Sequence, residues 1–333
     1  MKISSSLLCL LLILASLLLS EARLVGFHDL KRALVPETPL VLDYHGGPLL
    51  AGKGSLDIYL VWYGSFTPAQ KSIVRDFFAS FDAKAANVAP TLPSVSKWWE
   101  VTARYKDGNG THVFEAIKVV KEIQDDYSMG KKLDRNGTQE LILRNVFSGR
   151  FPMDTDSFYL VLTAKDVAEH GFCQQSCGYH RHTNETLEPA KDPTMPYGWV
   201  GDSTVQCSGR CAWPFAHPRD FFGPDKEPLL PPNGDVGMDG LLINVATVLI
   251  GAATNPYGTG YYQGHHHAHL GAATACAGIY GKGAFPGHPG ELLVDSKSGA
   301  SYNAYGINGR KFLLPAVWDP DTKKCAYPAP TPI

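Results

Sequence analysis

The sequence carries little net charge, because 30 Lys and Arg residues nearly balance 32 Asp and Glu residues and leave a formal charge of −2. It has no block of like charges and no basic patch, so neither a charged tail nor a nucleic-acid-binding surface is expected. It also lacks internal repeats and low-complexity segments, which argues against a solenoid. After the N-terminal apolar run no second run of about 20 apolar residues follows, so we expect no membrane span.

The N-terminal apolar run has its own pattern. Lys2 precedes the run at 7–19, and Ser20 and Ala22 place small residues at positions −3 and −1 before Arg23. This order is typical of a secretory signal peptide over residues 1–22. We therefore expect a mature chain that begins at Arg23 and is located outside the cytosol.

The cysteines agree with an oxidising compartment. Cys9 lies in the expected signal peptide, and an even number remains, which in a secreted chain indicates disulfides: Cys173, Cys177, Cys207, Cys211, Cys276 and Cys325. The simplest connectivity joins neighbours, 173 with 177, 207 with 211, and 276 with 325. The main alternative crosses the two C-x3-C motifs. A zinc site made by those four cysteines is a third alternative, which secretion disfavours.

Glycosylation is expected for the same reason. The sequence has three Asn-x-Thr acceptor sites, at Asn109, Asn136 and Asn184. Each lies in a polar stretch rich in turn-forming residues, where a surface glycan fits. We predict that at least one of the three is used.

The fold class follows from alternating strand and helix patterns. Residues 56–63 and 157–163 are rich in β-branched and aromatic residues and predict two buried, adjacent strands. Thr67 and Pro68 are typical of a helix N-cap and first turn. Strand–helix alternation predicts one compact α/β domain around a mixed sheet.

The remaining boundaries follow from composition. Residues 23–54 are expected to form an extended N-terminal segment, and the domain occupies 55–333. We expect the cysteine-rich segment at 170–235 to lie over the sheet as irregular loops. Over 94–118 the pattern predicts a short helix running into a hairpin, and over 137–148 it predicts a further helix.

A central apolar helix is predicted at 238–254. Between Asp239 and His265 the sequence contains no Asp, Glu, Lys, Arg or His, so a helix here is apolar on nearly all faces and must occupy the core. Asp239 is expected to cap the helix, and Asp235 to fix the preceding turn. Asn255 precedes a proline and is expected to end it.

Five long stretches of the sequence are specific enough to compare with known families: VWYGSFTPAQKSIVRDFF (61–78), GWVGDSTVQCSGRCAWPF (198–215), PNGDVGMDGLLINVATVLIGAATNPYGTGYYQG (232–264), GIYGKGAFPGHPGELLVD (278–295) and SYNAYGINGRKFLLPAVWDP (301–320). They resemble the plant Exordium family, also called the phosphate-induced protein family. The resemblance covers essentially all of the expected mature chain. It implies an apoplastic or cell-wall protein linked to growth and to brassinosteroid, carbon or phosphate responses, and it implies no particular chemistry.

A more remote resemblance concerns the end of the core helix. Residues 251–262 are similar to the end of the active-site helix in some secreted zincin metalloproteases. That alignment places Thr247, Val248 and Gly251 where two metal ligands and a catalytic glutamate belong, and none of the three can bind zinc or act as a base. The helix is therefore either a plain core helix or part of a degenerate zincin-like scaffold without zincin chemistry.

The best candidate metal site is a cluster of histidines. His265, His266, His267 and His269 follow the core helix, and His265 and His269 are spaced i, i+4. Such a tract can bind zinc weakly, although a solvated histidine-rich loop is the favoured interpretation. The resemblance to the family does not extend to this tract, so we expect no dedicated cofactor.

Other catalytic patterns are weak. No G-x-S-x-G motif is present, and the place of Ser203 and Ser208 in a stretch shared with the family does not by itself activate a hydroxyl. Glycoside hydrolysis needs two facing carboxylates, for which only Asp235, Asp239 and Glu291 are available. We therefore predict no catalytic residues.

Aromatic residues offer a binding alternative. They are Trp98, Trp99, Trp199, Trp213, Tyr261 and Tyr262, and flat apolar rings with polar edges suit wall glycans. A strand at 98–99 would expose one of the two indoles. The sequence thus predicts a secreted, non-catalytic growth or signalling protein whose partner is a cell-wall component or an apoplastic or receptor protein. A glycan-binding protein and a secreted hydrolase are the alternatives.

Overall fold

A five-stranded mixed sheet organises the protein in the computed structural model, which describes residues 40–183, 194–218, 227–265 and 270–330. The chain divides into two units, Met1–Leu40 and Val41–Ile333, and all elements below belong to the second. Residues 41–54, expected to be extended, form part of this unit: β1 (Asp43–Tyr44) pairs with β9 (Tyr261–Tyr262).

The sheet has the order β3-β2-β5-β8-β7. Its strands are β2 (Ser55–Tyr63), β3 (Ala116–Asp125), β5 (Phe158–Thr163), β7 (Gly178–His182) and β8 (Pro196–Gly201). Four strands are parallel, and the edge strand β7 is antiparallel to β8. The predicted strands at 56–63 and 157–163 are confirmed as buried neighbours, with Ile58 opposite Phe158.

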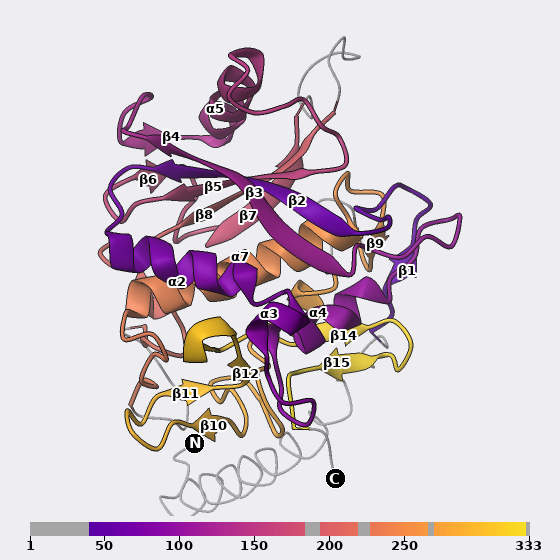
Figure 1. The fold of residues 1–333 in the computed structure, drawn as a ribbon, viewed down its shortest axis with the longest axis vertical. Coiled ribbons are helices and arrows are strands. Elements are labelled where there is room, and N and C mark those ends of the chain that lie inside the picture. The colour runs from indigo at the N-terminus through magenta and orange to yellow at the C-terminus, as the bar shows by residue number, and fades with distance from the viewer. Residues whose placement is uncertain (1–39, 184–193, 219–226, 266–269, 331–333) are drawn as a thin grey trace, which may run out of the picture. The chain divides into compact units, whose positions relative to one another are not determined.

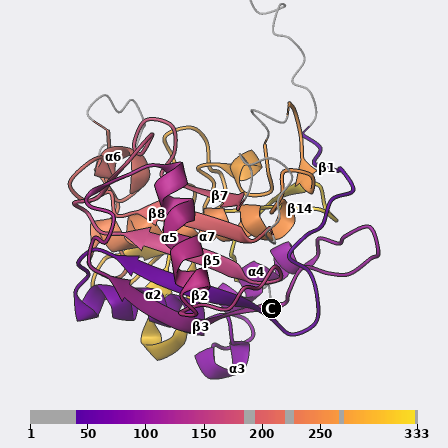
Figure 2. The same cartoon turned by 90° about the horizontal axis from the view of Figure 1, so that it is seen from above.

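Helices cover both faces of the sheet (Figures 1 and 2). The β2–β3 connection carries α2 (Pro68–Ala79), and the β3–β5 connection carries α5 (Arg135–Phe147). These two connections step in opposite directions along the sheet, so right-handed crossovers place their helices on opposite faces. Apolar residues of α5 join the core on one face, while α2 and α7 (Val236–Thr254) pack on the other.

Capping fixes the start of α2 as predicted. Thr67 Oγ1 accepts from the backbone N–H of Gln70, and the Gln70 side chain accepts from the backbone N–H of Thr67. Together they form a capping box, which satisfies two backbone donors at the helix end.

The core helix α7 is confirmed, but its cap is not the predicted one. Asp235 is the N-cap and accepts from the backbone N–H of Met238 at 3.0 Å. Asp239 lies one turn into the helix and is buried. The helix therefore begins three residues earlier than Asp239, because Asp235 already supplies the oxygen that the first turn needs.

Length and composition alone would allow α7 to cross a membrane, but most of it is buried inside the fold. It approaches the sheet closely at Gly198, where an added Cβ would lie 2.7 Å from Val248 Cγ1. Buried helices of soluble proteins share this apolar composition, so α7 is the central core helix that the sequence predicts.

The short helix predicted within 94–118 is confirmed, whereas the hairpin expected after it is reduced to one antiparallel bridge around a turn. Residues Val95–Ala103 form α4, a single bridge joins Lys106 and His112, and the next strand is β3, parallel to β2. Trp98 and Trp99 are both buried in α4, where each indole N–H donates to a backbone carbonyl. Both indoles therefore pack inside the fold from one helix.

Short elements complete the unit. They are α3 (Ala83–Ala86), β4 (Lys132–Leu133), β6 (Ala168–Glu169), α6 (Ser208–Cys211), η1 (Thr274–Cys276), β10 (Leu293–Val294), β11 (Ser301–Tyr302), β12 (Ala304–Tyr305), η2 (Ile307–Gly309), β13 (Lys311–Phe312), β14 (Val317–Asp319) and β15 (Lys324–Ala326). The last strands pair as β10–β11, β12–β13 and β14–β15. These hairpins lie next to α2 and α4 in Figure 1.

The disulfides correct the preferred neighbour pairing. Cys173 bonds to Cys207 and Cys177 to Cys211, which is the crossed alternative, whereas Cys276 bonds to Cys325 as predicted. Cys207 and Cys211 stand at the N-cap and the last residue of α6. Residues four apart on a helix face the same way, so both sulfurs point toward the other C-x3-C segment.

Candidate functional site

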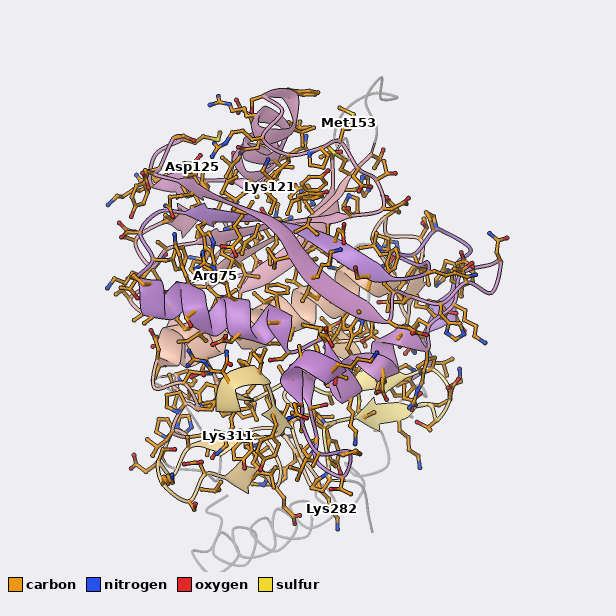
Figure 3. All side chains as sticks on the ribbon, viewed as in Figure 1. Arg75, Lys121, Asp125, Met153, Lys282 and Lys311 are labelled. Atoms are coloured by element: carbon orange, nitrogen blue, oxygen red, sulfur yellow. A yellow bond between two sulfur atoms is a disulfide. The ribbon has the colours of Figure 1, made fainter. Side chains whose placement is uncertain are left out.

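The candidate site is a polar pocket of about 490 Å³ between α2, the turn before α7, the β10–β11 loop and the η2–β13 segment. We call it the Arg310 pocket. Its polar lining residues are Ser72, Asp76, Asn233, Asp295, Ser298, Asn308, Arg310 and Lys311, and Pro232, Ala300 and Gly309 complete it. Figure 3 labels Lys311, where β13 lies below the two helices that cover the sheet.

Local structure brings these residues together. Ser72 and Asp76 are one turn apart on α2, and Ser72 Oγ donates to Asp76 Oδ2. The η2 turn docks on the end of this helix, because the backbone N–H of Ile307 donates to Ser80 Oγ. Asn308 then adopts a left-handed conformation with φ of 57° and donates from Nδ2 to Asp76 Oδ1.

Two ion pairs at consecutive residues line the pocket. Arg310 Nε donates to Asp76 Oδ2 at 2.9 Å, and Lys311 Nζ pairs with Asp295. All four side chains are less than a third exposed, whereas every other ion pair between described residues has one partner that is more than a third exposed. Hydrogen bonds from Lys311 and from Ser298 hold the pKa of Asp295 well below its usual range.

A hydrogen-bond network continues from the pocket into the core. Arg310 Nη1 donates to Asn233 Oδ1 at 3.2 Å, and Asn233 in turn donates to the buried Asp239. Burial raises the pKa of Asp239 to about 7, against the lowering effect of the Asn233 hydrogen bonds. The pocket wall is thus fixed to α7 through polar contacts.

This arrangement suits binding better than proton transfer. Asp76 and Asp295 are each held in an ion pair, and the lowered pKa of Asp295 makes that carboxyl a poor general acid. Asp239 lies behind Asn233, and no cysteine or histidine lines the pocket. The Arg310 pocket therefore presents fixed donors and acceptors rather than an activated nucleophile.

Most of the histidine tract lies outside the described residues. His265 is exposed, and His266, His267 and His269 are not described. Across the described part of the chain, no three His, Cys, Asp or Glu residues gather as a possible metal site. Weak zinc binding by the tract stays a prediction.

The zincin-like positions have structural roles. Thr247 Oγ1 donates to the Ile243 carbonyl at 3.0 Å, and Val248 packs against the sheet. At Gly251 an added Cβ would lie 2.6 Å from the imidazole of His180, so a larger side chain would not fit without movement. These positions serve helix packing.

The aromatic residues give no exposed glycan platform of the kind expected at Trp98–Trp99. Trp98, Trp99 and Trp199 are buried, and Trp213, Tyr261 and Tyr262 are half-buried. The expectation of one exposed indole is therefore wrong, since it assumed a strand where the chain forms α4.

The remaining residues considered for catalysis are not arranged as an active site. Ser203 is buried, and its Oγ has no hydrogen-bond partner among the described residues. Ser208 begins α6, and Glu291 is exposed. Asp235 and Asp239 are engaged in capping and in the Asn233 contact.

Two glycosylation acceptors are accessible. Asn109 is exposed in the turn that follows Asp107, and Asn136 is exposed in the first turn of α5. Asn184 lies outside the described residues. Use of these sites stays a prediction.

Sequence reasoning missed the pocket residues. They come from distant stretches, with Asp76 at 61–78, Asn233 at 232–264, Asp295 at 278–295 and both Arg310 and Lys311 at 301–320. Each of these stretches was singled out by its resemblance to the Exordium family. Their place in these family-like stretches was the only sequence feature that pointed to the pocket residues, because polar residues in loops have no periodic pattern.

The fold and site define a disulfide-bonded α/β protein with a polar pocket beside its core helix. The model of the phosphate-induced protein 1 conserved region matches residues 42–328. The chain is 46% identical to Protein PHOSPHATE-INDUCED 1 of Nicotiana tabacum over 87% of this chain and 89% of that protein. It is 45% identical to Protein EXORDIUM-like 2 (88% and 91% covered) and 43% identical to Protein EXORDIUM (86% and 88%), both of Arabidopsis thaliana.

The chain therefore belongs to the Exordium, or phosphate-induced protein, family. No solved structure matches it. The zincin-like scaffold thus has no support from the comparisons, and the family names state no catalytic activity.

Proposed function

We propose that this chain is a secreted glycoprotein of the plant apoplast and cell wall that acts in growth and in hormone- or nutrient-responsive signalling without catalysis. The observation that carries the proposal is membership of the Exordium family by a chain whose six cysteines at 173–325 all form disulfides. Disulfides of this kind persist in oxidising, extracellular compartments. The signal-peptide pattern at 1–22 supports the same location.

The pocket chemistry supports a role in binding. Its carboxylates are paired with Arg310 and Lys311, and no histidine or cysteine is among the residues that line it. The partner we propose is a cell-wall component or an apoplastic or receptor protein. No resident cofactor is needed for this role, and any zinc would be bound weakly by the histidine tract.

Secretion and catalysis are tested separately. Amino-terminal sequencing of protein from the extracellular fluid of plant cells should give Arg23 as the first residue. Retention of residues 1–22, or an intracellular location, would contradict secretion. The same preparation is then incubated with peptide and wall-polysaccharide substrates, for which we expect no turnover.

The hydrolase alternative makes the opposite prediction. Turnover that is lost when a single Asp, Glu or His is replaced would establish an enzyme and end the non-catalytic proposal. Asp76→Asn and Asp239→Asn are the variants to compare first, because these carboxylates lie in or behind the pocket.

A further inference from the structure

We propose that the Arg310 pocket binds a neutral, polyhydroxylated ligand, a saccharide unit, through the open hydrogen-bonding positions of Arg310, Lys311, Asn308 and Asp76. This inference rests on the proposed function, in which a wall component is one of the partners. It assigns that partner a chemical class and a site.

The first argument is the number of donors left open. The Arg310 guanidinium has five N–H groups, and it donates once from each nitrogen, to Asp76, Ser72 and Asn233. One N–H therefore remains on each terminal nitrogen. Lys311 donates one of its three N–H groups to Asp295, so two more remain.

Acceptors are left open at the same place. Asn308 donates from Nδ2 to Asp76, and its Oδ1 accepts no hydrogen bond from the described residues. Asp76 accepts from Arg310, Ser72 and Asn308, and a carboxylate has about four acceptor positions. A ligand that both donates and accepts at closely spaced atoms matches this surface, and adjacent hydroxyl groups do so.

Charge balance argues for a neutral ligand. Each cation in the pocket is in contact with a carboxylate, Arg310 with Asp76 and Lys311 with Asp295, so the four charges cancel. An anion that approached either cation would also approach a carboxylate, and like charges at short range repel. A cation would meet the same opposition from Arg310 and Lys311.

The volume and the rigidity of the Arg310 pocket also suit the binding of a small molecule. A volume of about 490 Å³ lies within the range of about 300–1,000 Å³ that is typical of small-molecule sites. The polar groups are held in place by α2, by the η2 docking bond to Ser80 and by the Asn233–Asp239 contact. Because they are already positioned, little conformational entropy is lost when a ligand binds.

The experiment measures binding of neutral saccharides to the full secreted protein. One arm uses soluble gluco-, xylogluco- and arabino-oligosaccharides in saturation-transfer NMR and titration calorimetry. A second arm measures retention on the insoluble neutral polysaccharides, and a third uses acidic oligogalacturonides. We expect saturable binding of at least one neutral saccharide and none of the acidic ones, and the first two arms distinguish a free sugar from a wall polymer as its source.

Arg310→Lys is the main variant, because it keeps the charge beside Asp76 and replaces the two open guanidinium N–H groups with ammonium donors in a different geometry. We expect it to weaken binding at least tenfold. Arg75→Lys is the matched control, since Arg75 also lies on the α2 surface and pairs with Glu122 outside the pocket, and it should bind as wild type. Asn308→Gly, which suits the left-handed backbone, provides a second test if Arg310→Lys does not fold.

The inference is overturned if no neutral saccharide binds, if only acidic oligosaccharides bind, or if binding survives in both pocket variants. In those cases the proposed function stands as long as the protein is secreted and does not turn over substrates. Turnover of a bound saccharide would instead contradict the non-catalytic proposal and leave the site assignment in place.

Discussion

Asn233 donates two hydrogen bonds to the carboxylate of Asp239, from its backbone N–H to Oδ2 at 2.9 Å and from Nδ2 to Oδ1 at 2.6 Å. Asp239 is buried on the core helix, whereas Asn233 also accepts from Arg310 in the pocket. This contact connects the N-terminal turn of α7 in the core to the wall of the Arg310 pocket.

Replacing Asn233 with Ala should destabilise the protein by about 1.5–3 kcal/mol, because a buried carboxyl group loses one hydrogen bond and keeps the backbone one. Urea unfolding followed by circular dichroism measures the change. Lys297→Ala, on an exposed side chain of the neighbouring loop, should leave the midpoint unchanged. Equal effects of the two variants would show that the Asn233 contact contributes nothing specific.

Ala246→Glu should destabilise by several kcal/mol and abolish folding if the protein is only marginally stable. Ala246 is fully buried on α7, and an unpaired charge would enter the core. Ala69→Glu is the control, since Ala69 is exposed in the first turn of α2, where an acidic side chain is favourable. A soluble Ala246→Glu variant with unchanged melting temperature would contradict the burial of α7.

The stability contributed by Glu169 should fall as the pH rises. Glu169 is buried, its Oε2 has no partner among the described residues, and burial raises its pKa from 4.5 to about 7. An acid with a raised pKa stabilises the folded state below its unfolded pKa, and this contribution is lost as the pH rises to about 7. Glu169→Gln keeps the Tyr179 contact and cannot ionise.

The measurement is the free energy of unfolding of both proteins between pH 4.5 and 7.5. Relative to Glu169→Gln, wild type should lose about 3 kcal/mol over this interval. Glu140→Gln, at an exposed residue of α5, should follow the wild-type curve. Parallel curves for wild type and Glu169→Gln would disprove the raised pKa.

The two crossed disulfides should contribute non-additively. Both bridges join the same two short segments, so either bridge alone still closes nearly the same loop. Removing one pair with Ser should cost roughly 2–3 kcal/mol, and removing both pairs should cost more than the sum of the two single losses. Removing the isolated Cys276–Cys325 bridge should cost about 4 kcal/mol by the same loop-closure argument.

Thermal unfolding of these Ser variants provides the measurement, and non-reducing peptide mapping provides the control for connectivity. Peptides joined through Cys173–Cys207 and Cys177–Cys211 should be recovered. Recovery of peptides with 173–177 and 207–211 bonds would restore the neighbour pairing.

Purified protein should bind no stoichiometric zinc through its core, since Thr247 and Gly251 occupy the positions where zincin ligands would lie. Zinc that is present should come from the tract at 265–269 and be released below about pH 6, as imidazoles become protonated. Elemental analysis of wild type and of a variant with the four histidines changed to Ala tests this. Tight one-to-one zinc in that variant would reveal a different site.

The sequence was most informative where one local signal decides the structure. The apolar runs at β2, β5 and α7 predicted buried elements, and Thr67 with Pro68 predicted the start of α2. These segments carry their own periodicity and caps, so tertiary contacts reinforce what local chemistry favours.

Prediction from the sequence failed where contacts between residues far apart in the chain determine the structure. Which cysteine faces Cys173 depends on how α6 is placed over the sheet, and whether Trp98 is exposed depends on what packs against it. The pocket shows the same limit, because Arg310 meets Asp76 across 234 positions in the chain. The resemblance to the family marked the stretches that matter without showing that they touch.

The distance in sequence between α2 and the η2–β13 segment also has a kinetic consequence. Contacts of long sequence separation form slowly and late, because a large loop must close first. The Arg310 pocket cannot exist until residues 307–311 have been synthesised and docked on α2. An incompletely synthesised or partly folded chain in which these residues have not yet docked on α2 would therefore lack the pocket.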